Sequence, residues 1–234
     1  MPHGNDVRMK SVNGHHVYEG DGKTYPSVTT VLQCIAYTKH IVEWANWLGM
    51  QHLSYEKTLN ATAIEGTLAH AHAQHLVDPE NGPMPEKADP LTDYYVQCRM
   101  KFFVERLEQY KGRWKTIYTE HPLLSHTYKI GGTMDWFAEW DGKPTLFDFK
   151  TSKGVRDKHL LQLGGYKLML EDNNIPVEQA GIIVIGRDFC RWSLFTKEEV
   201  DKFAEWFKLV YDYYWIHEEL EKMTVDTSVP YIDR

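Results

Sequence analysis

The sequence predicts an α/β protein in which a central mixed β-sheet is flanked by helices and preceded by a mainly helical N-terminal region. Apolar residues recur at helical spacing through most of the first 112 residues. They alternate with polar residues over 114–150, which is the period of a strand, and return to helical spacing after residue 156. A continuous apolar run at 181–186 indicates a further strand that is buried on both faces.

One domain is expected over residues 1–234, because this length and a hydrophobic fraction of 42% suffice for one sizeable core. Within it we expect a mainly helical part at 1–112, the sheet with its flanking helices at 113–220, and a tail at 221–234. Aromatic residues make up 13% of the chain, so most are expected to pack in the core, while others are available to stack on bases.

The charge and the cysteines narrow the class of protein. A net charge of −7 argues against a sequence-independent DNA coat protein, which would be basic, but it leaves room for an enzyme with a local positive groove. Cys34, Cys98 and Cys190 are dispersed and form no disulfide framework or Cys-x-x-Cys metal site, which fits a reducing compartment. The N-terminus has no apolar signal core, and no run approaches the length of a membrane span. We expect a soluble, cytoplasmic protein without a signal peptide or membrane contact.

The N-terminal part is expected to begin with strands and continue with helices. Asn-Gly and Asp-Gly pairs indicate turns, a side-chain oxygen before an apolar run indicates a helix cap, and Asp-Pro indicates a helix start. The expected elements, in order, are a hairpin over 7–19 turning at Asn13-Gly14, a turn at Asp21-Gly22, a short helix capped by Ser27 and running towards Ala36, helices over 40–54 and 60–77, a loop over 78–90, and a helix from Asp89-Pro90 to about Tyr110.

The second half is expected to supply the sheet and two long helices. Four strands are predicted at 115–120, 123–131, 133–140 and 145–150, followed by a helix over 156–172 and two strands at 181–186 and 191–195. Thr196 and Glu199 have the spacing of a capping box. This box opens a long helix with one apolar stripe, which we interpret as core, and the chain from Thr224 is expected to be irregular.

The strongest local pattern is a hairpin around Asp141-Gly142, which lies between two alternating runs. A two-residue turn places Asp135 opposite Asp148, with Lys150 on the same face. A four-residue turn would instead place Asp135 opposite Lys150, with Asp148 diagonal on that face, and a three-residue turn without a bulge would separate the residues.

Two carboxylates this close repel, so one takes up a proton or the pair binds a cation. With a lysine beside them, they suit a hard divalent metal ion that activates water. The alternative is a hairpin whose polar residues simply face solvent.

Other candidate residues lie before and after the hairpin. His70 on an alanine-rich helix is either a metal ligand or a packed histidine, and Glu120 is either an accessory carboxylate or an exposed residue at a strand end. Gln162 and Tyr166 lie at i and i+4 on one helical face. A basic group just before them either contacts phosphates or forms a solvated helix start; it comprises Lys153, Arg156 and Lys158.

Taken together, these patterns resemble the PD-(D/E)XK nuclease superfamily and, within it, the RecB-like exonucleases, with the greatest likeness to phage exonucleases and the mitochondrial genome maintenance exonuclease. The resemblance spans residues 26–166. It rests on four motifs: Pro26-Ser27-Val28-Thr29, Gly66-Thr67-x-x-His70, Gly132-x-x-Asp135 with Asp148-x-Lys150, and Gln162-x-x-x-Tyr166.

The resemblance implies a restriction-endonuclease-like core and a Mg²⁺- or Mn²⁺-dependent deoxyribonuclease. His70, Asp135, Asp148 and the Phe149 carbonyl would hold one or two metal ions, with Lys150 as a catalytic residue and Thr67 as an accessory. It also implies DNA as partner, single-stranded or with free ends, a role in recombination, repair or replication alongside other proteins of those processes, and a bacterial host cytoplasm if the gene is phage-borne.

The sequence departs from the family pattern at two points. Gln74 stands where many relatives carry an acidic residue, and the cysteines of the iron–sulfur branches are absent, so no cluster is expected. Three other functions stay open at this point. They are a non-catalytic DNA-binding module that keeps the fold, a structure-specific endonuclease, and an unrelated metal hydrolase acting on small molecules.

Overall fold

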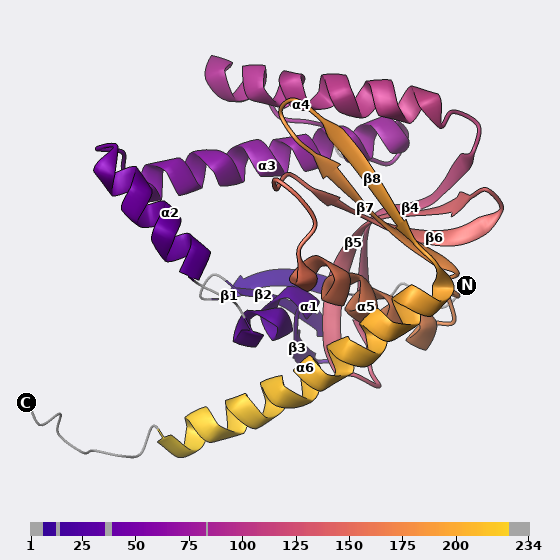
Figure 1. Cartoon of the computed structure of the whole chain (residues 1–234). Coiled ribbons are helices and arrows are strands. Elements are labelled where there is room, and N and C mark those ends of the chain that lie inside the picture. Colours follow the sequence, from indigo (N-terminus) through magenta and orange to yellow (C-terminus); the bar gives the residue numbers. More distant parts are fainter. Residues whose placement is uncertain (1–6, 13–14, 36–38, 83, 225–234) are drawn as a thin grey trace, which may run out of the picture.

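A computed structural model describes residues 7–12, 15–35, 39–82 and 84–224. It confirms the α/β class, with a mixed sheet between layers of helices (Figure 1). The central sheet has five strands in the order β4-β5-β6-β7-β8, and only β6 and β7 run parallel. The strands are β4 (Trp114–Ser125), β5 (Ile130–Trp140), β6 (Lys143–Lys150), β7 (Gln179–Ile185) and β8 (Cys190–Phe195).

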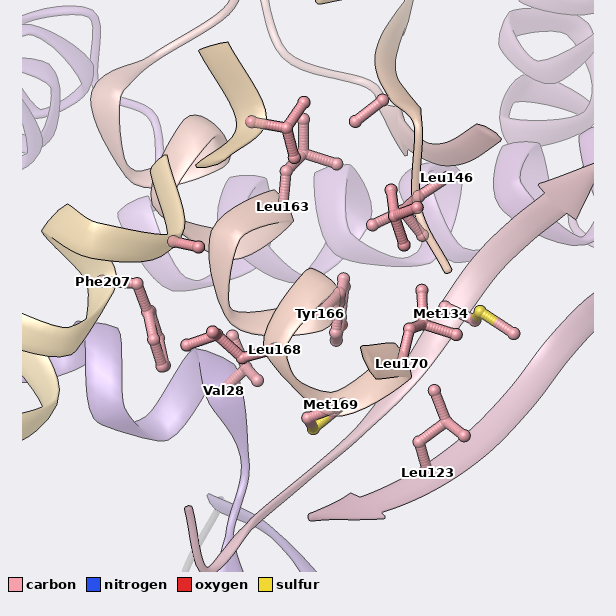
Figure 2. Packing of buried hydrophobic residues seen from close by; sticks show 14 of the residues in the cluster. Val28, Leu123, Met134, Leu146, Leu163, Tyr166, Leu168, Met169, Leu170 and Phe207 are labelled. Carbon is pink, nitrogen blue, oxygen red and sulfur yellow. The ribbon is translucent and has the colours of Figure 1, made fainter. Parts of the chain in front are cut away.

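Helices cover both faces of this sheet. On one face, α1 (Val28–Val31), α5 (Asp157–Asp172) and α6 (Lys197–Thr224) share a buried cluster with the strands. Figure 2 shows Tyr166 and Met169 of α5 inside this cluster, with Met134 of β5. On the other face, α3 (Tyr55–Val77) and α4 (Pro90–Gln109) pack against aromatic residues of β5 and β6. The parallel β6–β7 pair requires a crossover, and α5 is that crossover, so its face is fixed against the end of β6.

The N-terminal part contains a second, antiparallel sheet of β1 (Arg8–Val12), β2 (His15–Gly20) and β3 (Lys23–Pro26). The predicted hairpin is confirmed, although its Asn13-Gly14 turn lies outside the described residues. The Asp21-Gly22 turn is confirmed, with both residues at positive φ. Ser27 caps α1 as predicted, because its Oγ accepts from Thr30 N at 2.9 Å, and a 3₁₀ turn, η1 (Leu32–Ile35), follows; Ala36, the expected end of this segment, lies outside the described residues.

Two helix boundaries differ from the prediction. Helix α2 is Lys39–Met50 rather than 40–54, and α3 begins at Tyr55, five residues earlier than the predicted start at 60. The chain turns between them at His52, which has φ +56°, and the Ser54 side chain then caps α3 by accepting from Lys57 N. The cap was overlooked because Tyr55–Asn60 has no clear apolar periodicity.

The prediction of four strands before residue 150 was wrong in one respect. The segments 115–120 and 123–125 belong to one strand, β4, and 126–129 form the turn into β5. Polar residues and Pro122 suggested a break, but β4 absorbs them with a bulge near Ile117 and a positive φ at Glu120.

The turn at Asp141-Gly142 has two residues, as predicted, because Trp140 pairs with Lys143. Both turn residues have positive φ, 48° and 77°, which is the conformation that a tight hairpin matching the twist of the strands requires. The register then runs through Trp136–Phe147, so the next residues outward are Asp135 and Asp148. The four-residue alternative is excluded.

The last helix also follows the prediction. Thr196 and Glu199 form the capping box, with Thr196 N donating to Glu199 Oε2 at 2.8 Å and Glu199 N donating to Thr196 Oγ1 at 3.4 Å. Val200, Phe203 and Phe207 of α6 are buried. The helix continues to Thr224, so the tail predicted at 221–234 was wrong for 221–224, and the rest of it lies outside the described residues. In the described part of the chain, no helix combines the length and the apolar character that crossing a membrane demands.

Candidate active site

The site begins where β6 ends. Asp148 is 1% exposed, and its Oδ2 lies 2.5 Å from the Nζ of Lys150, two residues further on the same face of the strand. Burial raises the pKa of Asp148 to about 6, with Lys150 acting in the opposite direction and Asp135 adding to the rise. Oδ2 makes no hydrogen bond of good geometry despite the nearby ammonium, so a buried carboxylate oxygen here is incompletely satisfied.

Asp135 lies at the point where the β5–β6 ladder stops. Its Oδ2 accepts a hydrogen bond of 2.7 Å from the backbone N–H of Phe149, so a side chain takes the place of a ladder partner. Burial raises the pKa of Asp135 to about 6, although Lys150 and this N–H both lower it. The ammonium of Lys150 thus contacts Asp148 and acts on Asp135 through its charge, and all three residues lie together as the hairpin register predicted.

His70 reaches this pair from α3, across the sheet from α5. Its Nδ1 lies 3.7 Å from Asp135 Oδ2, and its ring packs edge-on against Phe149, with centroids 6.1 Å apart. Desolvation in the site, followed by the positive charge of Lys150, lowers the pKa of His70 to about 4. The ring is thus neutral at pH 7 and keeps a nitrogen lone pair, which is the form that ligates metal ions. The structure brings His70 together with the carboxylates, as the resemblance implied.

Gln162 and Tyr166 close the site from α5. Gln162 Nε2 donates to the Tyr166 hydroxyl at 3.1 Å, and both side chains are buried. The pKa of Tyr166 lies well above its usual value because of burial and then the negative charges of Asp135 and Asp148. The hydroxyl therefore stays protonated and is available as a hydrogen-bond donor beside the aspartates.

Gly132 makes room for Tyr166 on the surface of β5. A Cβ at this position would lie 2.6 Å from Tyr166 Cε1 and 2.8 Å from Met169 Cε. We expect Gly132→Ala to destabilise the fold by about 1–3 kcal/mol through overpacking. Chemical denaturation checks this, with Gly154→Ala as the control, because a Cβ there meets nothing within 4 Å. Equal unfolding free energies for the two variants would contradict the role of Gly132.

Glu120 is exposed, as the sequence favoured, but it lies inside β4 rather than at a strand end, and it lines the groove beside His70 and Gln74. The β4–β5 register places it opposite Asp135, between the pairs Thr119–Trp136 and His121–Met134. The buried Gln74 of α3 donates its amide N–H to Glu120 Oε1. Gln74 was noted only as a departure from the family pattern, and its partner 46 residues away gave no signal in the sequence.

An open groove of about 790 Å³ leads to these residues along one side of α3. His70, Gln74 and Glu120 line its inner end, and Thr67 is exposed in its wall. Small side chains of α3 keep the groove wide, and Gly66 lets the helix approach Thr151, whose Oγ1 would be 3.1 Å from a Cβ at that position. A flexible, narrow ligand can therefore reach His70, whose Nδ1 lies 3.7 Å from Asp135 Oδ2, from this side.

The predicted basic group lies between β6 and the first turn of α5. Lys153, Arg156 and Lys158 are exposed. The pKa of the buried His159 is lowered to about 3 by burial and then by the charges of Lys150, Lys158 and Arg156. Although the chain as a whole carries a net negative charge, positive charge is thus concentrated here, on the rim of the site.

A buried ion network supports the site from behind, and the sequence did not predict it. Glu65 is 3% exposed; Arg99 Nε donates to its Oε1 at 2.6 Å, and Arg187 Nε donates to the same oxygen at 2.9 Å. Arg99 also donates to two carbonyl oxygens, that of Thr151, the residue after β6, and that of Ile185, the last residue of β7. The network therefore ties α3, next to Gly66, to the sheet edge that carries Lys150.

The residues present fit a hard divalent ion better than a softer metal. The buried carboxylate of Asp148, whose Oδ2 is incompletely satisfied, the partly buried carboxylate of Asp135 and the neutral imidazole of His70 are donors that Mg²⁺ and Mn²⁺ accept. Among the described residues, no three His, Cys, Asp or Glu side chains already stand in a coordinating arrangement. The Phe149 carbonyl as a further ligand stays a prediction.

The Pro26-Ser27-Val28-Thr29 motif supports the site without lining it. Ser27 is buried and bridges to Gly131 at the start of β5, and Val28 packs against Gly165 of α5. The motif thereby holds the two elements that carry Asp135 and Tyr166.

No known family model matches the chain, and no curated protein matches its sequence. Among the solved structures that match is the crystal structure of SSO0001, with 19% sequence identity and a TM-score of 0.29. The match covers 49% of this chain and 60% of that chain, so this chain spans well under two thirds of the SSO0001 chain. This likeness is too low to bear on function.

Proposed function

We propose that the protein is a Mg²⁺- or Mn²⁺-dependent deoxyribonuclease that hydrolyses phosphodiester bonds, acting as an exonuclease on single-stranded DNA ends in recombination, repair or replication. The observation that carries the proposal is the pairing of the buried Asp148 with Asp135, whose side chain is 15% exposed, both with pKa values raised to about 6, beside a single ammonium from Lys150. A protein that only binds DNA has no need of such repelling carboxylates.

Each residue has a role in this proposal. Asp135, Asp148, His70 and the Phe149 carbonyl would hold the ion, which when bound lowers the pKa of a water molecule and offsets charge on the scissile phosphate. Lys150 stabilises the negative charge that develops on the phosphate oxygens, because its ammonium is already fixed in a site largely shielded from water.

The remaining residues hold the strand. Gln162 and Tyr166 present donors next to the aspartates, and the exposed Lys153, Arg156 and Lys158 suit backbone phosphates at the rim. The groove along α3 is open, and its wall includes the small residues Ala63, Gly66 and Ala71, so it suits a narrow, unpaired strand better than a duplex. Glu120 and Thr67 are accessory residues of this groove.

The proposal is tested on end-labelled single- and double-stranded DNA, closed circular single-stranded DNA and RNA of the same sequence, with Mg²⁺, Mn²⁺ or EDTA. We expect metal-dependent degradation of linear single-stranded DNA. Cutting of the circle would make the enzyme a structure-specific endonuclease, and DNA binding without turnover under all conditions would favour the non-catalytic module.

Lys150→Met is expected to lower kcat by about 10²–10³-fold, since it removes a preorganised charge from the transition state. Lys153→Met is the matched control. We expect it to raise KM several-fold and leave kcat nearly unchanged, because Lys153 lies on the exposed rim. A Lys150→Met enzyme with wild-type kcat would remove the catalytic role assigned to this lysine.

A further inference from the structure

Helix α6 carries a second apolar face that the fold does not bury. All of its exposed large apolar residues lie on this face, and each is 47–74% exposed. Successive members are three and four residues apart in strict alternation. They are Trp206, Leu209, Tyr213, Ile216, Leu220 and Met223, hereafter the α6 stripe.

The α6 stripe points away from the rest of the domain. Phe207 is fully buried in the core, and Leu209, two residues later, lies about 200° further round the helix. Figure 1 shows the C-terminal half of α6 running out beyond the other elements. A body that docks on the stripe therefore meets no obstruction from the sheet or from α5.

Alternating spacings of three and four define the seam of a coiled coil, in which each side chain enters a hole on a partner helix. The stripe extends over about 26 Å of helix, because each residue adds about 1.5 Å. The N-terminal half of α6 already packs against the core through Val200, Phe203 and Phe207. A partner can therefore bind to a helix that is already formed.

The charges beside the stripe disfavour an antiparallel second copy. Within the stripe, Trp206, Tyr213 and Leu220 are the first apolar positions of successive heptads, and Leu209, Ile216 and Met223 are the second. The residue before each first position is acidic: Glu205, Asp212 and Glu219. The residues after Leu209 and Ile216 are not acidic: they are Val210, which packs partly against the core, and His217. In a parallel pair, the residues before the first positions of one helix lie beside the residues after the second positions of the other, so Asp212 lies beside His217 of the other copy. In an antiparallel pair, the acidic residues of the two helices would face each other.

We propose that two copies of this chain associate through the α6 stripe as a parallel, in-register helix pair with the rest of each domain on the outside. The domains do not collide, because each lies on the face of α6 opposite its stripe. The inference is independent of the proposed function, since none of these residues lines the groove or the carboxylate site.

Sedimentation equilibrium of the full chain at micromolar concentrations tests the proposal. We expect a mass twice that of the 27.4 kDa chain, and a dissociation constant about 100-fold higher for Leu209→Glu/Ile216→Glu, which places carboxylates in the seam. The control is Leu91→Glu/Val104→Glu, two exposed apolar residues of α4, which should leave the mass unchanged. A wild-type monomer throughout, or a double-glutamate variant that dimerises like wild type, overturns the interface.

The orientation is tested by Leu209→Cys under mild oxidation, against wild type with its three native cysteines. In the parallel pair the two new thiols face each other within reach of a disulfide, which spans about 4–7 Å between Cα atoms. In an antiparallel pair they would be about 16 Å apart along the axis. A crosslinked dimer supports the parallel arrangement, and its absence rules that arrangement out.

Discussion

Asp148→Asn is expected to abolish hydrolysis and, at the same time, to make the metal-free protein more stable at pH 8. The loss of activity should be about 10³-fold or more in kcat, because the variant removes the charge of a residue that we propose as a metal ligand. The gain in stability follows from the same burial that makes Asp148 useful. One carboxylate, Asp135, remains for the one ammonium of Lys150, so the charges still balance.

The sign of the stability effect depends on the raised pKa. An aspartate whose folded pKa is about 6 and whose unfolded pKa is about 3.8 contributes stability fully below pH 3.8, and this contribution is lost as the pH rises through 6. Asp148→Asn should therefore gain about 1–3 kcal/mol over wild type at pH 8 in EDTA, and this gain should shrink towards zero near pH 4. Thermal or urea unfolding at both pH values measures it.

Asp141→Asn is the matched control, since Asp141 is an exposed aspartate in the same hairpin. The hydrogen-bonded Arg113 guanidinium lowers the pKa of Asp141, so this group contributes stability at neutral pH that is lost on acidification. Its replacement should cost little or be slightly destabilising at pH 8, and nuclease activity should be retained. If Asp148→Asn were instead less stable than wild type at pH 8, as expected when one partner of an ion pair is removed, the idea that the buried Asp148 carboxylate destabilises the fold would be wrong.

Glu65→Ala is expected to destabilise the protein by about 3–5 kcal/mol, because it leaves the buried Arg99 guanidinium without its counter-charge. Burial raises the pKa of Glu65, but hydrogen bonds from Arg187 and Arg99 outweigh it, and the net pKa lies below the usual value. The ionised form is therefore the one that the fold requires. Denaturant unfolding at pH 7 gives the free-energy difference.

The control for Glu65 is Glu19→Ala, which removes the exposed pair with Lys10 at 2.7 Å. A surface pair of this kind contributes about 0–1 kcal/mol. A further readout separates positioning from bulk stability. Glu65→Gln should recover part of the fold, yet show a raised KM at temperatures where the variant is fully folded, because Gly66 and the groove wall are no longer held against Thr151. A Glu65→Ala protein as stable as Glu19→Ala would show that the arginines find other partners.

The sequence was sufficient for the parts of the fold that local rules determine. The Asp141-Gly142 turn fixed the register of β5 and β6, and this register alone placed Asp135 beside Asp148. Gln162 and Tyr166 were predictable for the same reason, since a helix places i and i+4 together. The capping box of Thr196 and Glu199 and the buried β7 were also local signals.

What the sequence did not predict depends on contacts between distant residues. Arg99 and Arg187 lie 34 and 122 residues from Glu65, and Glu120 lies 46 residues from Gln74, so no spacing rule connects them. The continuity of β4 through Pro122 and Glu120 was missed for a related reason. The pairing with β5 across a bulge outweighs the local preference of these residues to end a strand.

The hydrogen bond from Phe149 to Asp135 turns one backbone amide into a reporter. Because this N–H donates to a carboxylate and not along the ladder, its proton chemical shift and exchange rate depend on whether Asp135 is charged, neutral or engaged by a cation. A single ¹⁵N-labelled phenylalanine resonance would thus follow the titration near pH 6 and the arrival of Mg²⁺, with no nucleic acid in the tube. Ion binding can in this way be measured separately from substrate binding and from turnover.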